Sequence, residues 1–448
     1  MNEKHLATLL PMTLAAAFLH ASQTTVVPGG DDTMNIQSAV DSCFKAGGGE
    51  VVLAPGEYWV KGLRLRSGIT LRLKGGAKLR ASRNPADFDG VVTGDAVEPA
   101  MPGDFDSEDR LVKTCTNRWN NGIIRIFKAC NVAVIGEAGS EINGRNCYDP
   151  NGEEKFRGPH GISVHFSSNV VFRGYTIRDA GNWAHRFCLS SDITVEDVTI
   201  LGGHDGVDFH ACDRGRVHRC RIRSGDDCIA GYDNDDISVK DCSLNSACSI
   251  FRIGGRNILA ENLVVAGPGA YCHRVTLPQE DIKSGANPEG CGRRNTLSFF
   301  TYYGNPRSRF PSGNIVFRNC RVSGVDRFLH YNFSGNEPWQ KGAALTDVAF
   351  ENVHAENVAY SLTAYSGKGT SLTIGFRDCT FTFGEFVNEF IKGANVGAVS
   401  ADGLKVKRVN GPFMRVWEET TPKLDMKRCT GIGPVSEKAV RPFKVKAI

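Results

Sequence analysis

The sequence predicts an all-β protein in which short strands stack as the coils of a solenoid. Three observations predict this fold class. A strand-forming unit recurs at a nearly constant interval, its apolar residues follow no helical period, and Gly, Asn, Asp or Ser ends each unit. Repeats this short stack coil upon coil, so residues at equal offsets lie above one another.

The repeated unit has an apolar residue, an apolar residue or Cys three positions later, and another apolar residue two positions after that. In the most regular part, from Val164 to Val265, successive units begin 23, 22, 22 and 21 residues apart. Stacked coils should place equivalent residues roughly 4.8 Å apart, the spacing of neighbouring strands. The units begin at Phe172, Val195, Val217, Val239, Ala260, Phe317, Phe350 and Phe376.

The N-terminal part predicts a helix that covers the open end of the solenoid. Asp31, Asp32 or Thr33 can cap its first turn, and Gly47-Gly48-Gly49 ends it after about Phe44. Without such a cover, the first coil would expose an unpaired strand edge. Strands are expected next, at residues 50–53, 58–60, 63–65 and 69–73.

We expect one domain, residues 23–448, because a solenoid grows by adding coils rather than by adding separate cores. Three stretches rich in Pro, Gly or charged residues interrupt the repeat and are predicted to be long loops. Loops of this length in a repeat protein usually form functional walls. They span residues 91–121, 144–161 and 277–292.

Composition excludes several classes of function. The net charge of +4 over 448 residues is small and dispersed, which argues against a nucleic-acid partner. The 15 Cys contain no paired C-x-x-C motif, so no metal and no cofactor are expected. Four of them occupy the middle position of the repeated unit and are predicted to pack inside the solenoid: Cys220, Cys242, Cys320 and Cys379.

Residues 1–22 resemble a secretory signal peptide. Lys4 precedes an apolar run from Leu6 to Leu19, and the small residues Ala21 and Ser22 follow. No other run approaches the roughly 18 apolar residues that a membrane span needs. We therefore expect a secreted or periplasmic protein without a membrane span.

Two aspartates lie at the same offset in adjacent coils. Asp205 follows Val195 by ten residues, and Asp227 follows Val217 by ten residues, with Asp226 beside it. Three carboxyl groups this close cannot all ionise freely, so at least one pKa is expected to be raised. A raised acid beside an ionised carboxylate is the arrangement that glycoside hydrolysis uses. We expect the three side chains to meet in an open cleft.

Six motifs of the sequence carry a resemblance: Asp31-Asp32-Thr33, Gly47-Gly48-Gly49-Glu50-Val51-Val52, Ile142-Asn143-Gly144-Arg145, Trp183-x-His185, His204-Asp205-Gly206-Val207-Asp208 and Gly225-Asp226-Asp227-Cys228-Ile229. With these motifs the sequence resembles glycoside hydrolase family 28, the polygalacturonase-like enzymes. The resemblance implies the pectin-lyase-like fold, a right-handed parallel β-helix, and a polysaccharide or oligosaccharide substrate bound by a monomer. It implies Asp226 as general acid, with Asp205 and Asp227 holding the water that attacks, and inversion at the sugar carbon. Inverting enzymes separate their carboxyl groups by roughly 6.5–9.5 Å, so Asp226 should point away from the other two.

The sequence departs from polygalacturonases where they carry substrate-binding cations. Ser246-Ala247-Cys248-Ser249 stands in place of a His-Gly motif, and no Arg-Ile-Lys follows Gly254. The repeat suggests replacements, because thirteen residues after successive unit starts lie His185, Asp208, Ala230, Arg252 and His273. We expect Arg252 and His273 to contact the substrate, and His185 and His204 are further candidates for substrate binding.

Two other functions fit the same fold. A polysaccharide lyase would need a Ca²⁺ site and a Lys or Arg base near the acids, and its unsaturated products would absorb ultraviolet light. A non-catalytic glycan-binding or adhesive solenoid would tolerate replacement of all three aspartates. Packing is the alternative role for His185, and backbone bonding within turns is the alternative for the aspartates.

Overall fold

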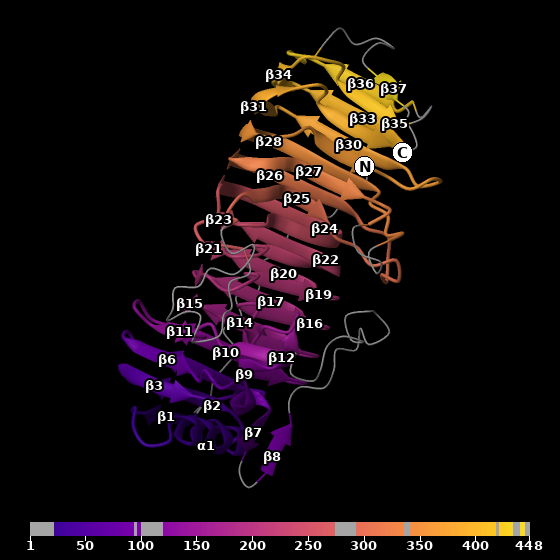
Figure 1. Ribbon diagram of the computed structural model, residues 1–448. Coiled ribbons are helices and arrows are strands. Elements are labelled where there is room, and N and C mark those ends of the chain that lie inside the picture. The colour runs from indigo at the N-terminus through magenta and orange to yellow at the C-terminus, as the bar shows by residue number, and fades with distance from the viewer. Residues whose placement is uncertain are drawn as a thin grey trace, which may run out of the picture.

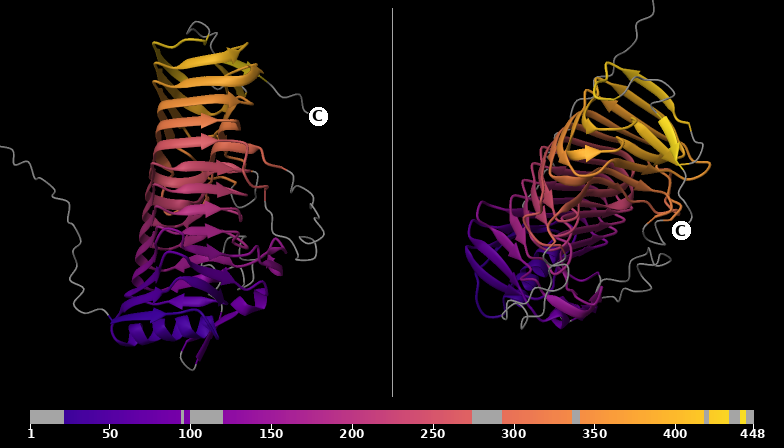
Figure 2. Two further views of the ribbon diagram at one scale, coloured as in Figure 1. Left: turned by 90° about the vertical axis from the view of Figure 1, so that its left-hand side faces the viewer. Right: turned by 45° about the horizontal axis from the view of Figure 1, so that its top comes forward.

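The fold is a parallel β-helix, as the repeat predicts. The computed structural model describes residues 22–93, 96–99, 120–273, 293–335, 341–417, 421–432 and 440–443. Thirty-four strands join in one continuous sheet that winds along the molecule. Figures 1 and 2 show the coils stacked one above another, from the N-terminal end to the C-terminal end.

Each regular coil contributes one strand to each of three parallel ladders. The first ladder contains β4 (Leu63–Leu65), β9 (Gly122–Phe127), β13 (His160–His165), β16 (His185–Cys188), β19 (Val207–His210), the starts of β22 (Ile229–Lys240) and β24 (Ser249–Ala266), β25 (Thr296–Tyr302), β27 (Val325–Asn332), β29 (Leu362–Tyr365), β32 (Ile391–Ala394), β35 (Met414–Trp417) and β37 (Val440–Phe443).

The second ladder follows the first along the chain within each coil. It contains β1 (Ser22–Val26), β2 (Gly49–Leu53), β5 (Ile69–Leu73), β10 (Cys130–Gly136), β14 (Ser168–Arg173), β17 (Ser191–Glu196), β20 (Asp213–His218), the later parts of β22 and β24, β26 (Gly313–Ser323), β28 (Asp347–Val358), β30 (Leu372–Arg377), β33 (Val396–Asp402) and β36 (Lys423–Lys427).

The third ladder completes the coil. It contains β3 (Gly56–Val60), β6 (Ala77–Ala81), β11 (Glu141–Asn143), β15 (Thr176–Arg178), β18 (Thr199–Leu201), β21 (Arg221–Ser224), β23 (Ser243–Ser246), the ends of β24, β26 and β28, β31 (Thr380–Val387) and β34 (Lys405–Val409).

The repeated unit is the second ladder and its turn into the third. Every predicted unit start pairs with the next one in register, including across the long insertion between Ala260 and Phe317. These residues point into the solenoid and are at most 3% exposed. The periodicity prediction is therefore confirmed, because each inward apolar residue packs on its equivalents in the coils above and below.

The interior Cys predicted from the repeat are also confirmed. Cys220, Cys242, Cys320 and Cys379 are buried, and each is a free thiol. Their sulfur atoms lie 3.1–4.0 Å from backbone carbonyls of neighbouring coils or of their own turn. They fill the positions where other coils place Tyr, Val or Leu.

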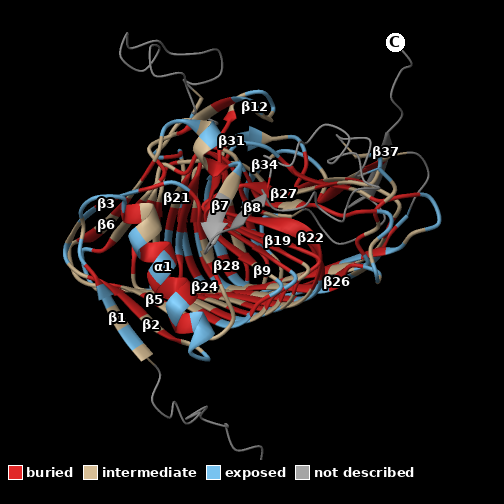
Figure 3. Cartoon of the chain, turned by 90° about the horizontal axis from the view of Figure 1, so that it is seen from below, coloured by how far each residue is buried: buried red, intermediate tan, exposed pale blue. Residues whose placement is uncertain are grey.

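The predicted N-terminal helix is α1, Asp32–Lys45. The Asp31 side chain accepts a hydrogen bond from the Met34 amide at 3.1 Å, which caps the first turn. The helix lies across the end of the solenoid, where Ile36, Val40 and Cys43 pack on the first coils (Figures 1 and 3). Strands β2 to β5 follow within a residue or two of the predicted ranges.

The loop predictions are partly wrong. β7 (Gly90–Thr93) and β8 (Ala96–Pro99) pair as antiparallel strands after the short 3-10 helix η1 (Pro85–Phe88). Residues 148–153 form β12 (Tyr148–Glu153), which bridges Arg157 at both ends. Residues 94–95 and 100–119 of the first predicted loop, the third predicted loop and the signal-like segment before Ser22 lie outside the described residues. Across the described chain, no helix has the length and apolarity to span a membrane.

Candidate active site

The structure brings the three predicted aspartates together. Asp205 and Asp227 occupy equivalent positions just before β19 and β22, which pair with a 22-residue offset. The Asp227 amide donates to Asp205 Oδ1 at 3.1 Å, and the Gly206 amide donates to the Asp227 carbonyl at 2.9 Å. One carboxylate oxygen from each of Asp205, Asp226 and Asp227 lies within 4.8 Å of the other two. The expectation that Asp226 points away from its neighbours is therefore wrong.

Hydrogen bonds to the backbone fix the turn that presents Asp226. The hydroxyls of Ser224 and Ser246 both donate to the Asp226 carbonyl, the first at 2.8 Å. The Asp226 amide donates to the His204 carbonyl of the preceding coil at 3.2 Å. The carboxylate therefore projects from a backbone that is held on both sides.

The expectation of an open cleft is not met at the carboxylates themselves. Asp205, Asp226 and Asp227 are 6%, 3% and 2% exposed. The chain after β12 accounts for part of this burial, because Arg157 lies against Asp226. Asp205, Asp226 and Asp227 are called the trio below. Solvent has better access to the trio beside Arg252 and His273, whose side chains are 27% and 17% exposed.

Burial and mutual repulsion raise the carboxyl pKa values, as the sequence predicts. Burial is the largest cause for Asp205, whose pKa is raised well above its usual range, and repulsion from Asp226 and Asp227 adds to it. Burial followed by repulsion from Asp226 also raises the pKa of Asp227, and Arg252 opposes this increase. The trio therefore retains at least one proton where isolated aspartates would have lost it.

Arg157 is the principal site residue that sequence reasoning missed. Its Nη2 lies 3.3 Å from Asp226 Oδ2, its Nε lies 3.0 Å from Glu154, and its Nη1 donates to the Asn182 side chain at 3.2 Å. The side chain is 4% exposed. Arg157 lies within residues 144–161, which the sequence predicted to be a functional loop. No spacing in the sequence relates position 157 to position 226, so its contact with Asp226 could not be predicted.

Arg252 lies beside the trio, as expected. Its Nη1 is 3.9 Å from Asp227 Oδ2, and its guanidinium stacks over the Tyr303 ring at 4.5 Å. It is in register with Ala230 and, through that residue, with Asp208 in the preceding coils. The repeat thus placed Arg252 correctly on the outward side of the first ladder.

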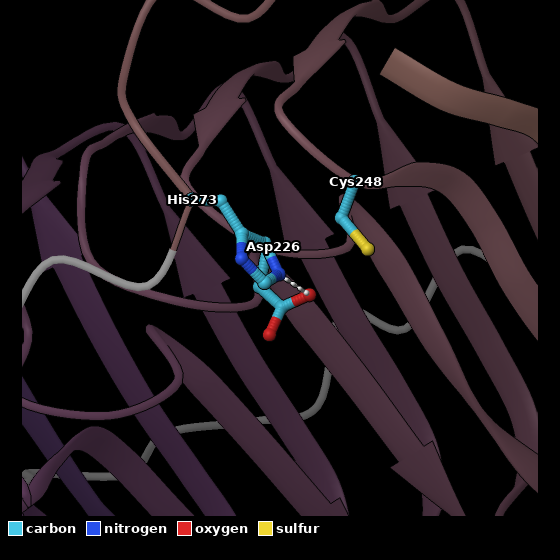
Figure 4. A group of neighbouring side chains, drawn as sticks. All are labelled: Asp226, Cys248 and His273. Carbon is cyan, nitrogen blue, oxygen red and sulfur yellow. Dashed lines mark ion pairs between the residues drawn. The ribbon is translucent and has the colours of Figure 1, made fainter. Parts of the chain in front are cut away.

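His273 also reaches the trio, but by a different route from the one predicted. The residue in register with Arg252 in the next coil is Thr301, so His273 does not continue that line. It lies after β24, and its Nε2 is 3.6 Å from Asp226 Oδ1 (Figure 4). The His273 ring therefore contacts Asp226 of the trio directly.

His204 and His185 do not offer their rings to solvent. Both are fully buried. The His204 ring packs against Phe156, with ring centroids 5.8 Å apart. The His185 ring lies inside the solenoid, where its Nε2 pairs with the Tyr175 hydroxyl at 2.7 Å. Burial lowers the pKa of His185 to about 3, so the ring is neutral.

The prediction of a substrate-binding His185 fails because of one extra residue. The coil starting at Phe172 has 23 residues, and the additional one falls between β15 and β16. Arg186, not His185, is therefore in register with Asp208. A shift of one residue along a strand turns every side chain to the opposite face, which puts His185 inside.

Comparison with known proteins assigns a family to the part of the chain that carries this site. Residues 62–265 match the model of glycosyl hydrolases family 28. A probable polygalacturonase of Vitis vinifera is 26% identical over 222 residues, which is 46% of this chain and 43% of that protein. A polygalacturonase of Juniperus ashei is 28% identical over 137 residues, 29% of this chain and 26% of that protein. The chain thus spans less than half the length of these curated relatives.

Solved structures share the fold over nearly the whole chain. The family 28 exopolygalacturonase of Yersinia enterocolitica aligns with 95% of this chain and 79% of its own at 14% identity, with a TM-score of 0.54. The hyperthermoactive exopolygalacturonase of Thermotoga maritima aligns with 90% of this chain and 92% of its own at 15% identity, with a TM-score of 0.56. These structures share the fold of the chain, and the segment that matches the model of glycosyl hydrolases family 28, residues 62–265, holds Asp205, Asp226 and Asp227.

Proposed function

We propose that this protein is a glycoside hydrolase that cleaves O-glycosidic bonds of a pectin-like polysaccharide by acid and base catalysis. One observation carries the proposal: three carboxyl groups meet within 4.8 Å inside the segment that matches family 28. The raised pKa values of Asp205 and Asp227 support it, because such a site keeps a proton to donate alongside a charged carboxylate.

Asp226 donates the proton to the leaving oxygen, and Asp205 and Asp227 hold and activate the attacking water. Two features support this division. Asp205 and Asp227 occupy equivalent positions in adjacent coils, so they form a natural pair, while Asp226 alone of the three also contacts Arg157 and His273. The free protein keeps at least one proton in the trio, and the proposed mechanism requires that proton on Asp226 when the substrate is bound.

Arg252 binds the sugar on the accessible side of the trio. Its cation is partly exposed, and the Tyr303 ring and Asp227 hold it in place. A guanidinium in this position suits an acidic sugar, because arginine pairs with a carboxylate through two parallel hydrogen bonds. The names of the polygalacturonase relatives point to the same substrate class.

A lyase mechanism fits the site less well, although two arginines lie beside the acids. A lyase base must lose its proton near neutral pH. Burial lowers the pKa of Arg157, but attraction by Glu153, Glu154 and Asp226 outweighs burial and raises it overall. For Arg252 as well, attraction by Tyr303 and Asp227 outweighs burial, so the pKa is raised. Both guanidinium groups stay charged and serve as electrostatic partners.

The first test measures release of reducing ends from polygalacturonan, rhamnogalacturonan and other plant glycans. Asp205→Asn, Asp226→Asn and Asp227→Asn should each lower kcat/KM by about 10²–10⁴ on the substrate that the protein cleaves. Asp192→Asn is the matched control and should retain full activity, because Asp192 is an exposed aspartate that pairs with Arg214 on the surface. Full activity in the triple Asp→Asn variant, or products that absorb ultraviolet light, would contradict the hydrolase.

A second test separates the roles. On an aryl glycoside with a good leaving group, Asp226→Asn should lose much less activity than on the polysaccharide, because departure no longer needs a proton. Asp205→Asn and Asp227→Asn should lose as much on both substrates, and azide should rescue them. The reverse pattern would assign the acid to Asp205 or Asp227.

Inversion at the sugar carbon is part of the proposal and has its own test. Proton NMR of the first product formed should show the anomer opposite to that of the substrate bond. The short distance between the carboxyl groups is close to the roughly 5–5.5 Å of retaining enzymes. A retained anomer would therefore overturn inversion without overturning hydrolysis.

Export is proposed from the signal-like residues 1–22 alone. N-terminal sequencing of protein recovered from outside the cytoplasm should begin near Ser22. A mature protein that still begins at Met1 would contradict export by this segment.

A further inference from the structure

Three side chains of different chemistry converge at the accessible edge of the trio. Asp226, Cys248 and His273 each place one donor atom within 4.8 Å of the other two (Figure 4). The donors are a carboxylate oxygen, a thiol sulfur and an imidazole nitrogen. We propose that they form a binding site for zinc or a similar soft divalent cation, which blocks the hydrolase when it is occupied.

The distances suit a tetrahedral ion. Zinc lies about 2.0–2.3 Å from its nitrogen, oxygen and sulfur ligands, so two ligands of one tetrahedral ion are roughly 3.3–3.8 Å apart. His273 Nε2 and Asp226 Oδ1 are already 3.6 Å apart. The widest separation, at most 4.8 Å, closes by about 1 Å when side chains rotate onto the ion.

The backbones that carry two of the donors are tied together. The Ser246 hydroxyl donates to the Asp226 carbonyl and accepts a hydrogen bond from the Cys248 amide at 2.7 Å. The Leu297 amide donates to the Cys248 carbonyl at 2.8 Å. The His273 amide donates to the Arg293 carbonyl at 3.0 Å. A site whose donors are held in this way loses little entropy when the ion binds.

Charge and access favour a cation. Asp205 and Asp227 add their carboxyl groups within 4.8 Å of Asp226, and the guanidinium groups of Arg157 and Arg252 offset part of this negative charge. Cys248 and His273 are partly exposed, which gives the ion an entrance. Thiolate and imidazole ligands select zinc over magnesium and calcium, which prefer oxygen. Three protein ligands leave a fourth position for water.

Binding of the ion releases one proton from the protein. The ion takes one oxygen of Asp226, the imidazole nitrogen of His273 and the sulfur of Cys248, whose thiol proton passes to solvent. Inhibition rests on the proposed function, because the ion occupies the carboxylate that protonates the leaving group. The binding site itself does not depend on that function, so the two are tested separately.

Direct binding is measured on the full purified chain, kept reduced by a reductant that does not bind metal. Isothermal titration calorimetry should show that zinc binds to the protein and that calcium and magnesium do not bind to the same site. Cobalt should give a thiolate-to-metal charge-transfer band. Cys248→Ser and His273→Gln should each weaken zinc binding by about tenfold or more and remove or weaken that band.

Two exposed residues of the same types provide matched controls. Cys130→Ser and His354→Ala, both on the surface away from the trio, should bind zinc as the parent does. If Cys248→Ser does not fold stably, His273→Gln still tests the site, because a partly exposed side chain can be replaced with little effect on folding. Unchanged zinc affinity in His273→Gln, or calcium binding as tight as zinc binding, would overturn the site.

Activity provides the second readout. Zinc should inhibit the parent, and a chelator should restore the activity. The zinc concentration for half inhibition should rise about tenfold or more in Cys248→Ser. Equal inhibition of the parent and Cys248→Ser would overturn the inhibitory role. Tight, Cys248-dependent zinc binding in a protein that cleaves no glycan would confirm the site and refute the hydrolase.

Discussion

An exposed aspartate, Asp192, and a buried set, Asp205 and Asp227, have pKa values shifted in opposite directions. Asp192 pairs with Arg214 across a 22-residue step at 2.6 Å, and the two side chains are 46% and 52% exposed. The hydrogen bond from Arg214 lowers the pKa of Asp192. Asp205 and Asp227 are separated by the same step, yet burial raises the pKa of both.

The repeat therefore sets spacing but not chemistry. In both sets an aspartate stands one coil away from a charged partner. On the exposed turn the partner is a cation and water solvates both groups, so the ionised form is favoured. In the trio, burial and repulsion between the carboxyl groups outweigh attraction by Arg157 and Arg252, so the neutral forms of Asp205 and Asp227 are favoured. Burial and the sign of the neighbouring charge decide the outcome.

The largest expected effect comes from removing the buried cation. Arg157→Met should lower the free energy of unfolding by about 3–5 kcal/mol, because Asp226 and the neighbouring glutamates lose their compensating charge. Urea unfolding at neutral pH measures it. A loss below about 1 kcal/mol would mean that this pair behaves like an exposed one, which would break the comparison.

Arg252 lies between the two extremes, since its side chain is 27% exposed while that of Asp227 is 2%. Arg252→Ala should lower the unfolding free energy by about 1–3 kcal/mol, because Asp227 stays buried without its guanidinium. It should also raise KM on the true substrate, measured by steady-state kinetics. An unchanged KM would remove Arg252 from substrate binding.

The pH dependence of stability should have opposite signs in the two sets. The raised pKa of Asp205 means that the folded state holds more protons than the unfolded chain above about pH 4, so its contribution to stability falls as pH rises through that window. Asp205→Asn should therefore gain stability relative to the parent as pH rises.

The lowered pKa of Asp192 gives the opposite pH dependence of stability. Its contribution is present above the unfolded pKa and is lost as pH falls through the folded value. Asp192→Asn should lose a little stability at neutral pH and none at low pH. Urea unfolding at several pH values measures both variants, and parallel curves for the two would refute the sign difference.

The smallest effect is expected at the exposed pair. Arg214→Ala should change the unfolding free energy by less than about 1 kcal/mol, because solvent screens the pair and ordering two long side chains costs entropy. Adding salt should reduce the effect further, which thermal melts at low and high ionic strength would detect. A salt-independent loss would show that the surface turn is more rigid than its exposure indicates.

The fold could be predicted from the sequence because its signal is local and repeated. Every unit start from Phe172 to Phe376 pairs in register, and Asp205 and Asp227 come together as the 22-residue step requires. The same reasoning failed where a coil departs from that step. One added residue before His185 turned that ring inward, and an insertion moved His273 off the line of Arg252.

By itself, the sequence determined the stacking of the coils, the capping helix and the meeting of three carboxyl groups. These follow from apolar periodicity and turn residues, which act within one coil and its neighbour. Only the tertiary structure decided how deeply the carboxyl groups are buried and which side chains face them. Arg157 and His273 come from excursions outside the repeat, and the path of such a segment depends on packing that no spacing in the sequence encodes.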